Sequence, residues 1–179
     1  MRICFFGVGG VGGYFGTIVT DKFIDKHDIY FVARGRHKSA ILSNGLTLKK
    51  SGGELIINVT PSQCTDNIDD LPVCDIVFLS VKGYDLADAA KSLNKISNEK
   101  TIILPLLNGV DIYERIRKHL STGIVLPSCV YIGTHIESPG VIFQKGGNCN
   151  LSIGKDPEFP DFHPHSLLAL LTDSSLDFK

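Results

Sequence analysis

The chain has 179 residues, of which 43% are hydrophobic and 21% charged, a composition typical of a folded globular protein. This length fits one domain and can bury a core without disulfide or metal cross-links. With a formal net charge of -1, the chain has no overall positive field that would hold nucleic acid or an anionic membrane. Composition therefore excludes a DNA-binding protein, a membrane protein and a small secreted scaffold.

The N-terminal apolar run is predicted to form a strand, a turn and a helix rather than a signal peptide. Arg2–Phe6 is a short apolar segment, and six glycines follow between Gly7 and Gly16. Glycines at this density make a poor hydrophobic helix, and no small-x-small cleavage site follows. With a helix over Val11–Lys22 and a second strand at Asp28–Ala33, the segment predicts a βαβ unit.

Strands and helices continue to alternate through the rest of the chain. The patterns predict a helix at 37–43, a hairpin at 46–59, a strand at 75–81, a helix at 86–96, a strand at 101–107, a helix ending near 120, strands at 124–132, 141–144 and 151–153, a loop at 155–165 and a last helix from 165. This order predicts an α/β fold, a Rossmann-type doubly wound and mainly parallel sheet. Ligands of such sheets bind beyond the carboxyl ends of the strands.

The cysteines favour a reducing compartment, and we predict a cytoplasmic location. There are five, an odd number without CxxC spacing, at Cys4, Cys64, Cys74, Cys129 and Cys149. A free cysteine in or beside an apolar run behaves as a small hydrophobic residue. We expect buried structural thiols.

A glycine-rich turn follows the first predicted strand. Gly7-Val8-Gly9-Gly10-Val11-Gly12 fits the G-x-G-x-x-G pattern of dinucleotide-binding proteins. In that pattern the first glycine permits the tight turn, the second lets the backbone approach a pyrophosphate, and the third lets helix and strand pack closely. The phosphates would lie at the helix N-terminus, where free N–H groups favour anions.

The end of the second strand indicates which dinucleotide binds. NAD-binding units usually carry an acid there, whereas Arg34 follows Phe31-Val32-Ala33 in this chain. An arginine can bind a 2′-phosphate through paired, charge-assisted hydrogen bonds. We therefore predict NADPH (NADP) with Arg34 as its main contact. Arg36 and Lys38 are either helpers or solvated surface charges.

Two polar residues follow the next predicted strands. Lys82 comes directly after the third central strand, and Asn108 follows the strand at 101–107. An asparagine at that place offers both a donor and an acceptor near the nicotinamide end. Either residue alone is common in loops, so the prediction rests on their shared position.

Other patterns of catalytic or metal-binding residues are incomplete. Asp161, His163 and His165 lack a further well-spaced ligand, so no metal site is predicted. His135 is read as a structural strand-end residue. The sequence contains neither a nucleophile elbow nor a Walker lysine.

Taken together, these motifs resemble the ketopantoate reductase (2-dehydropantoate 2-reductase) family. The resemblance covers roughly residues 1–155, and its segments are Gly7–Gly16, Ala33-Arg34-Gly35, Val81–Asp85, Asn108-Gly109, Ser138–Ile142 and Leu151–Gly154. Gly10 stands where the family often has alanine, a difference that we expect to be harmless.

The resemblance implies NADPH-dependent reduction of 2-dehydropantoate to (R)-pantoate on the route to pantothenate and coenzyme A. By position, the segment Gly7–Gly12 would take the pyrophosphate and Arg34 the 2′-phosphate. Lys82 would contact the cofactor, Asn108 both cofactor and substrate, and Ile136 would approach the nicotinamide with its backbone. The expected partner is a small 2-keto acid, with no nucleic acid and no membrane.

Family members continue into a helical domain that carries the catalytic lysine, the general acid, and most substrate-binding residues. This sequence ends at Lys179, so no catalytic residue is predicted in it. We expect residues 1–165 to form the NADP-binding domain and residues 166–179 to begin the connection to the missing domain, through which an oligomer could form. The alternatives are a non-catalytic nucleotide-binding fragment and a related reductase of another 2-keto acid.

Overall fold

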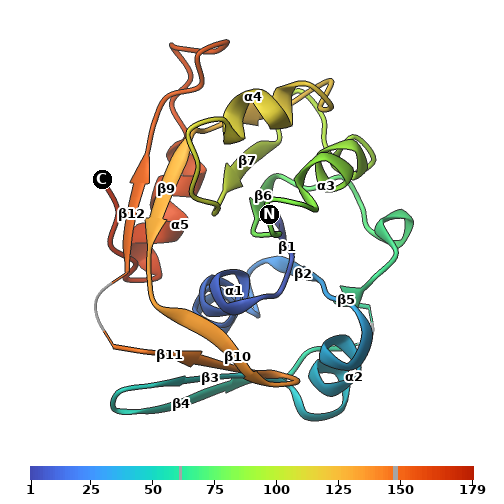
Figure 1. The fold of residues 1–179 in the computed structure, drawn as a ribbon, viewed down its shortest axis with the longest axis vertical. Helices are drawn as coiled ribbons and strands as arrows, with labels where there is room; N and C mark the ends of the chain where they lie inside the picture. The colour runs from blue at the N-terminus through green and yellow to red at the C-terminus, as the bar shows by residue number, and fades with distance from the viewer. Residues whose placement is uncertain (61, 147–148) are drawn as a thin grey trace.

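A computed structural model describes residues 1–60, 62–146 and 149–179. Its centre is a six-stranded parallel sheet in the order β5-β2-β1-β6-β7-β8 (Figure 1). Renumbered within this sheet, that is the 3-2-1-4-5-6 order of the Rossmann fold. The predicted fold class is confirmed.

The core lies on both faces of the central strands. Strands β1 (Arg2–Phe6), β2 (Asp28–Val32) and β6 (Ile76–Leu79) are almost wholly buried, because helices cover a parallel sheet on both sides. Apolar residues of α1 (Gly10–Phe23) and α5 (His165–Asp173) pack on one face. Helices α3 (Leu86–Leu93) and α4 (Ile112–Arg117) pack on the other.

Five further elements complete the sheet and its connections. They are α2 (Gly35–Asn44), β5 (Cys64–Thr65), the 3-10 helix η1 (Ile68–Asp70), β7 (Ile102–Pro105) and β8 (Ile124–Val125). The turn Gly7–Gly9, the start of α2 and the loops after β6 and β7 all emerge at the carboxyl edge of the sheet (Figure 1).

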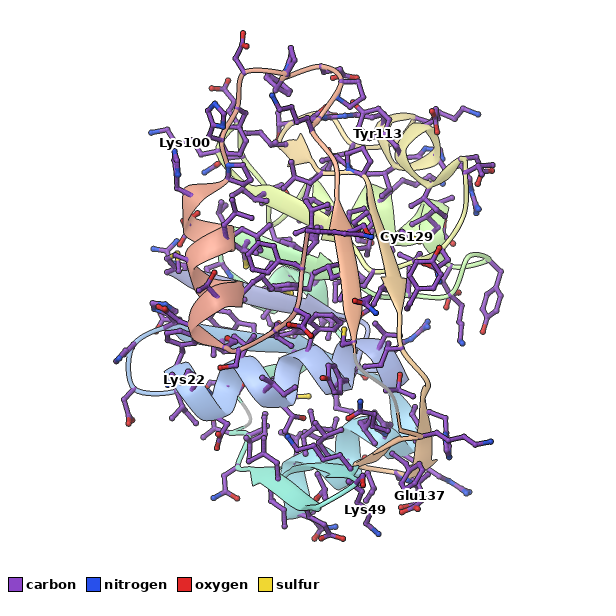
Figure 2. The ribbon with its side chains drawn as sticks, turned by 90° about the vertical axis from the view of Figure 1, so that its left-hand side faces the viewer. Lys22, Lys49, Lys100, Tyr113, Cys129 and Glu137 are labelled. Atoms are coloured by element: carbon purple, nitrogen blue, oxygen red, sulfur yellow. The ribbon has the colours of Figure 1, made fainter. Side chains whose placement is uncertain are left out.

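A second sheet packs against α1. Strands β3 (Leu46–Lys50) and β4 (Gly53–Ile57) form the predicted hairpin, and β10 (Thr134–Ser138) pairs with β11 (Val141–Gln144). The two hairpins join through a parallel pairing of β11 with β3. Figure 2 shows Lys49 of β3 and Glu137 of β10 at this sheet, where their charged groups lie 2.9 Å apart.

The prediction of one strand over 124–132 is wrong. The segment divides into β8, at the edge of the central sheet, and β9 (Ser128–Tyr131), which pairs with β12 (Asn150–Ile153). Pro127 lies between them, and a proline has no N–H to donate to a strand ladder. The predicted helix at 86–96 ends earlier, at Leu93.

The C-terminal residues pack into the domain. Leu167, Leu170 and Leu171 of α5 are buried in the same core as Phe5, and the backbone of Phe178 bridges in parallel to Leu151 of β12. A domain boundary at residue 165 stays a prediction. Among the described helices, none is long and apolar enough to cross a membrane.

Candidate functional site

Three adjoining cavities follow the carboxyl edge of the parallel sheet, and we call them together the sheet-end cleft. The first, of about 320 Å³, lies near the ends of β2 and β6. The middle cavity, of about 260 Å³, borders the glycine turn, and the last, of about 340 Å³, lies near the end of β7. Arg34 and Asp85 line the first two cavities, whereas Ser80 and Lys82 line the last two.

The glycine turn is built as the motif predicts. Gly7 has a positive φ of 98°, and its N–H and that of Val8 donate to the carbonyl oxygen of Val32 at 3.1 and 3.3 Å. A methyl group on Gly12 would lie 2.0 Å from the carbonyl oxygen of Gly7. A methyl group on Gly9 would meet nothing within 4 Å, so the backbone is open at that point.

The start of α1 fits a phosphate group. Gly9 is the N-cap residue of the helix, so no N-cap side chain binds the first N–H groups. The first turn carries no acidic residue that would repel an anion. The first N–H groups of a helix have no partner within it, and the helix dipole favours an anion there. Gly9, Gly10 and Val11 line the last cavity beside this helix end.

A close contact with the second sheet explains why residue 10 is a glycine. A methyl group at this position would lie 2.7 Å from the carbonyl oxygen of Thr134 in β10. The glycine therefore lets the second sheet approach the start of α1.

Arg34 lies at the end of β2 as predicted, and it has a carboxylate partner. Its Nη2 lies 2.9 Å from Oδ2 of Asp85, with the two side chains 74% and 34% exposed. Asp85 comes from the loop after β6, so nothing local in the sequence pairs it with Arg34. The acid that is missing from the end of β2 is therefore supplied by the loop after β6.

The two predicted helper cations differ from Arg34 in their placement. The ammonium group of Lys38 lies 2.7 Å from Oδ1 of Asp66, and this hydrogen bond lowers the pKa of that carboxyl. Asp66 lines the first cavity, whereas Arg36 lines none of the three. Arg34 is therefore the cation of this group that faces the cleft.

Lys82 is an exposed cation at the centre of the cleft. Its ammonium group forms no hydrogen bond or ion pair with any residue that the structure describes, which leaves it available to an anionic ligand. Arg115 of α4, which the sequence did not indicate, also lines the last cavity. Its guanidinium donates to the carbonyl oxygen of Gly83.

Asn108 lines the last cavity, but its amide also binds β9. Its Nδ2 donates to the carbonyl oxygen of Val130 at 2.8 Å, and its Oδ1 accepts the N–H of Val130 at 3.0 Å. The thiol of Cys129, the one cysteine that is not buried, donates to the same Oδ1 at 3.3 Å. One N–H of the Asn108 amide remains for a ligand.

Ile136 lies in a different part of the cleft from Asn108. It is 43% exposed on β10 and lines the middle cavity together with Val8 and His37. Val130 and Ile132 line the last cavity beside Asn108. The predicted contact of Ile136 with a nicotinamide stays a prediction.

His37 is a site residue that the sequence did not indicate. Its Nδ1 accepts the N–H of Gly140 at 3.0 Å, in the turn between β10 and β11. Burial lowers the pKa of His37, and the backbone of Val8 opposes that shift. A neutral imidazole thus connects the start of α2 with the second sheet.

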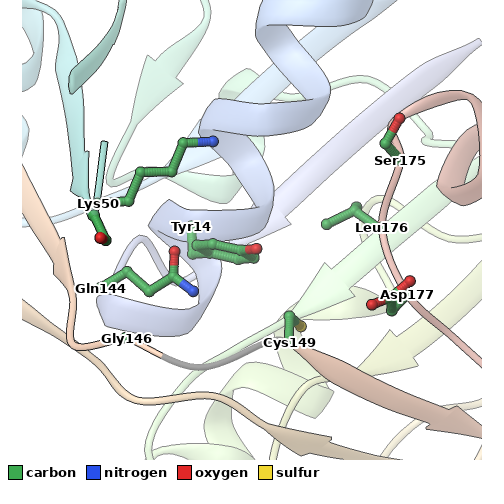
Figure 3. Close-up of a pocket in the computed structure, with 9 residues that line it drawn as sticks. Tyr14, Lys50, Gln144, Gly146, Cys149, Ser175, Leu176 and Asp177 are labelled. Carbon is green, nitrogen blue, oxygen red and sulfur yellow. The ribbon is translucent and has the colours of Figure 1, made fainter. Parts of the chain in front are cut away.

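A separate cavity of about 420 Å³ lies between α1, the second sheet and the C-terminal residues Ser175–Asp177 (Figure 3). Tyr14, Lys50, Cys149 and Asp177 are among its lining residues, and it shares none with the sheet-end cleft. Burial raises the pKa of Tyr14 to about 12 and that of Cys149 to about 11, so both are protonated at neutral pH. Within the described residues, no group of three or more His, Cys, Asp or Glu is placed to hold a metal ion.

Comparison with known proteins decides the family. A model of the ketopantoate reductase family (PanE/ApbA) matches residues 3–158. The chain belongs to the ketopantoate reductase family. The resemblance drawn from the sequence motifs is confirmed, and with it membership of a family of nicotinamide-dependent oxidoreductases.

Individual relatives agree with this assignment. A 2-dehydropantoate 2-reductase of Mesorhizobium japonicum is 26% identical over 175 residues, covering 87% of this chain and 52% of the relative. The crystal structure of 2-dehydropantoate 2-reductase from Porphyromonas gingivalis W83 has a TM-score of 0.88 at 29% identity, over 100% of this chain and 63% of that one. This family member thus spans about half the length of its curated relative.

One structural neighbour shares the fold alone. D-mandelate dehydrogenase, in a ternary structure with NADH and anilino(oxo)acetate, has a TM-score of 0.84 at 18% identity. The match covers 100% of this chain and 56% of that one.

Proposed function

We propose that this ketopantoate reductase family member binds NADPH in the sheet-end cleft and serves the reduction of 2-dehydropantoate to (R)-pantoate. The observation that carries the proposal is the spatial order of the polar and glycine residues along the cleft. Arg34 lines the first and the middle cavities, Lys82 and Gly9 of the open glycine turn line the middle and the last, and Asn108 lines the last. This arrangement suits an extended dinucleotide that carries a pyrophosphate in its middle and a 2′-phosphate near one end.

Each group has a role that follows from its chemistry. The N–H groups at the start of α1 would hold the pyrophosphate, and Arg34 would bind the 2′-phosphate. Lys82 would add charge at the centre, and the remaining N–H of Asn108 would meet the nicotinamide or substrate. When bound, the dinucleotide supplies the hydride that reduces the 2-keto carbon. We place the general acid outside these 179 residues.

A binding titration tests the cofactor. Calorimetry with NADPH and NADH should show binding, and Arg34→Ala should weaken NADPH binding by about ten- to hundredfold, since a charge-assisted hydrogen bond contributes roughly 1.5–3 kcal/mol. NADH affinity should change little, because NADH has no 2′-phosphate. Arg36→Ala is the matched control, because Arg36 lines none of the three cavities. Failure to bind either nucleotide would contradict the proposal.

An activity assay tests the reaction. NADPH oxidation that depends on 2-dehydropantoate is measured for this chain and for the longest natural reading frame that contains it. Turnover in either form supports the proposed reduction. Nucleotide binding without turnover in both forms favours a non-catalytic binding module, and turnover of a different 2-keto acid alone favours a related reductase.

A further inference from the structure

The guanidinium that faces the cleft at the end of β2 is paired with a carboxylate. Arg34 Nη2 and Asp85 Oδ2 lie 2.9 Å apart, and both residues line the first and the middle cavities. A nucleotide whose 2′ substituent lies against Arg34 therefore meets Asp85 as well.

The carboxylate of Asp85 is directed at Arg34 rather than at its own helix. Asp85 occupies the N-cap position of α3, yet its side chain makes no capping hydrogen bond. Its backbone is fixed, since its N–H donates to the carbonyl oxygen of Lys82 at 2.9 Å and its own carbonyl accepts the N–H of Ala89 at 3.0 Å. Within the part of the chain that the structure describes, Arg34 is its one side-chain partner.

The other carboxylates of the first cavity are each paired with a lysine. The ion pairs are Asp66 with Lys38 at 2.7 Å, Asp69 with Lys95 at 2.6 Å, and Asp88 with Lys91 at 3.4 Å. None of these acids lines the middle cavity, where Asp85 does. Asp85 is thus the acid of this group that lines both cavities. Because each acid of the first cavity is paired with one cation, that cavity offers no excess of positive charge to a phosphate.

This pairing should weaken the binding of NADPH and strengthen the binding of NADH. A 2′-phosphate at Arg34 would be repelled by the neighbouring carboxylate and would compete with it for the guanidinium donors. A 2′-hydroxyl would instead find an acceptor, as it does in proteins that carry an acid at the end of the second strand.

We propose that Asp85 is a specificity-determining residue that lowers the preference for NADPH over NADH, by placing beside Arg34 the carboxylate that the end of β2 lacks. The inference rests on the proposed cofactor site and adds a determinant from the loop after β6. It makes Arg34 and Asp85 together, rather than Arg34 alone, the unit that selects the cofactor.

Asp85→Asn tests the proposal, because it removes the charge and keeps the shape. Asparagine is also well accepted at an N-cap, and a thermal unfolding curve checks that the variant folds. Calorimetric dissociation constants for NADPH and NADH should show the NADPH:NADH affinity ratio rising about tenfold, roughly the effect of one charge-assisted contact. Asp88→Asn is the control, since Asp88 lines the first cavity but pairs with Lys91; its ratio should stay as in the unmodified chain.

The outcomes separate this inference from the proposed function. If both nucleotides bind and Asp85→Asn leaves the ratio unchanged, the pair is a surface contact and the inference is overturned. A falling ratio overturns it too, because Asp85 would then orient Arg34 for the phosphate. If the unmodified chain binds neither nucleotide, the proposed function itself fails, and this inference fails with it.

Discussion

The hydroxyl of Ser80 donates to the carbonyl oxygen of Gly7 at 2.6 Å. This bond joins the glycine turn to the end of β6, at the point where the strand order reverses between β1 and β6. Crevices of doubly wound sheets open at such a point, and Ser80 lines both the middle and the last cavities. The bond fixes the turn in the position from which α1 starts.

The close contacts at this junction predict that alanine substitutions at Gly12 and Gly9 differ strongly in their cost to stability. A methyl group on Gly12 would lie 2.0 Å from the carbonyl oxygen of Gly7 and 2.2 Å from Oγ of Ser80. Gly12→Ala should therefore lower the free energy of unfolding by roughly 2–3 kcal/mol, as overpacking does. Urea denaturation measures the loss.

Gly9→Ala is the matched control for that substitution. A methyl group there meets nothing within 4 Å, so the cost should stay below about 1 kcal/mol, the usual range for a glycine-to-alanine change at an N-cap. Equal losses in the two variants would show that the close packing of Gly12 on Gly7 does not hold the turn.

The placement of the main cleft residues could be predicted because the signal is local. A polar residue just after an apolar strand lies at the carboxyl edge of the sheet, whichever strands pair. Arg34, Lys82 and Asn108 follow β2, β6 and β7, and all three line the cleft. The glycine turn is local in the same way, since its pattern encodes a backbone shape.

The partners of these residues could not be predicted. Asp85 lies 51 positions from Arg34, and Gly140 lies 103 positions from His37. Such pairs depend on which strands become neighbours, and strand pairing is not encoded in a run of apolar residues. For the same reason the sequence did not separate β3 and β11 from the central sheet.

A buried carboxylate away from the cleft should matter for stability. Asp156 is 1% exposed, and it accepts hydrogen bonds from Arg117, from the hydroxyl of Tyr113 and from the N–H of Val125. Asp156→Ala would leave the largely buried guanidinium of Arg117 without this partner. Breaking a buried pair from one side costs about 3–5 kcal/mol, which a denaturation curve would resolve.

Glu158 provides the comparison for Asp156. Its carboxylate lies 3.6 Å from Nε of the same arginine, but its side chain is 57% exposed. An exposed pair contributes less than about 1 kcal/mol, so Glu158→Ala should leave the free energy of unfolding nearly unchanged. A similar loss in both variants would contradict the assignment of Asp156 as the main partner of Arg117.

Asn108 should hold β9 against the end of β7 through its two hydrogen bonds with the backbone of Val130. Asn108→Asp keeps the acceptor but loses the Nδ2 donor, which leaves the carbonyl oxygen of Val130 facing a carboxylate. We expect a loss of about 1–3 kcal/mol and faster hydrogen exchange of the β9 amides. Cys129→Ser changes the side chain at the 3.3 Å contact to Oδ1 but keeps both hydrogen bonds between Asn108 and the backbone of Val130, so it should leave that exchange unchanged. Unaltered exchange in Asn108→Asp would show that the amide does not position β9.

His37 should make stability depend on pH. Its Nδ1 accepts the N–H of Gly140, which requires that nitrogen to be unprotonated. Burial holds the pKa of His37 below its ordinary value of 6.5, so the unfolded chain binds the proton more readily than the folded one. The stabilisation is then complete above the unfolded pKa and is lost as the pH falls below it.

Urea denaturation at about pH 7.5, 6.5 and 5.5 measures this loss. The test variant is His37→Asn, whose side-chain oxygen can accept the N–H of Gly140 and does not titrate in this range. Its free energy of unfolding should fall less steeply with decreasing pH than that of the unmodified chain. Parallel pH curves would mean that protonating His37 costs the folded state nothing, and the hydrogen bond to Gly140 would then not depend on a neutral imidazole.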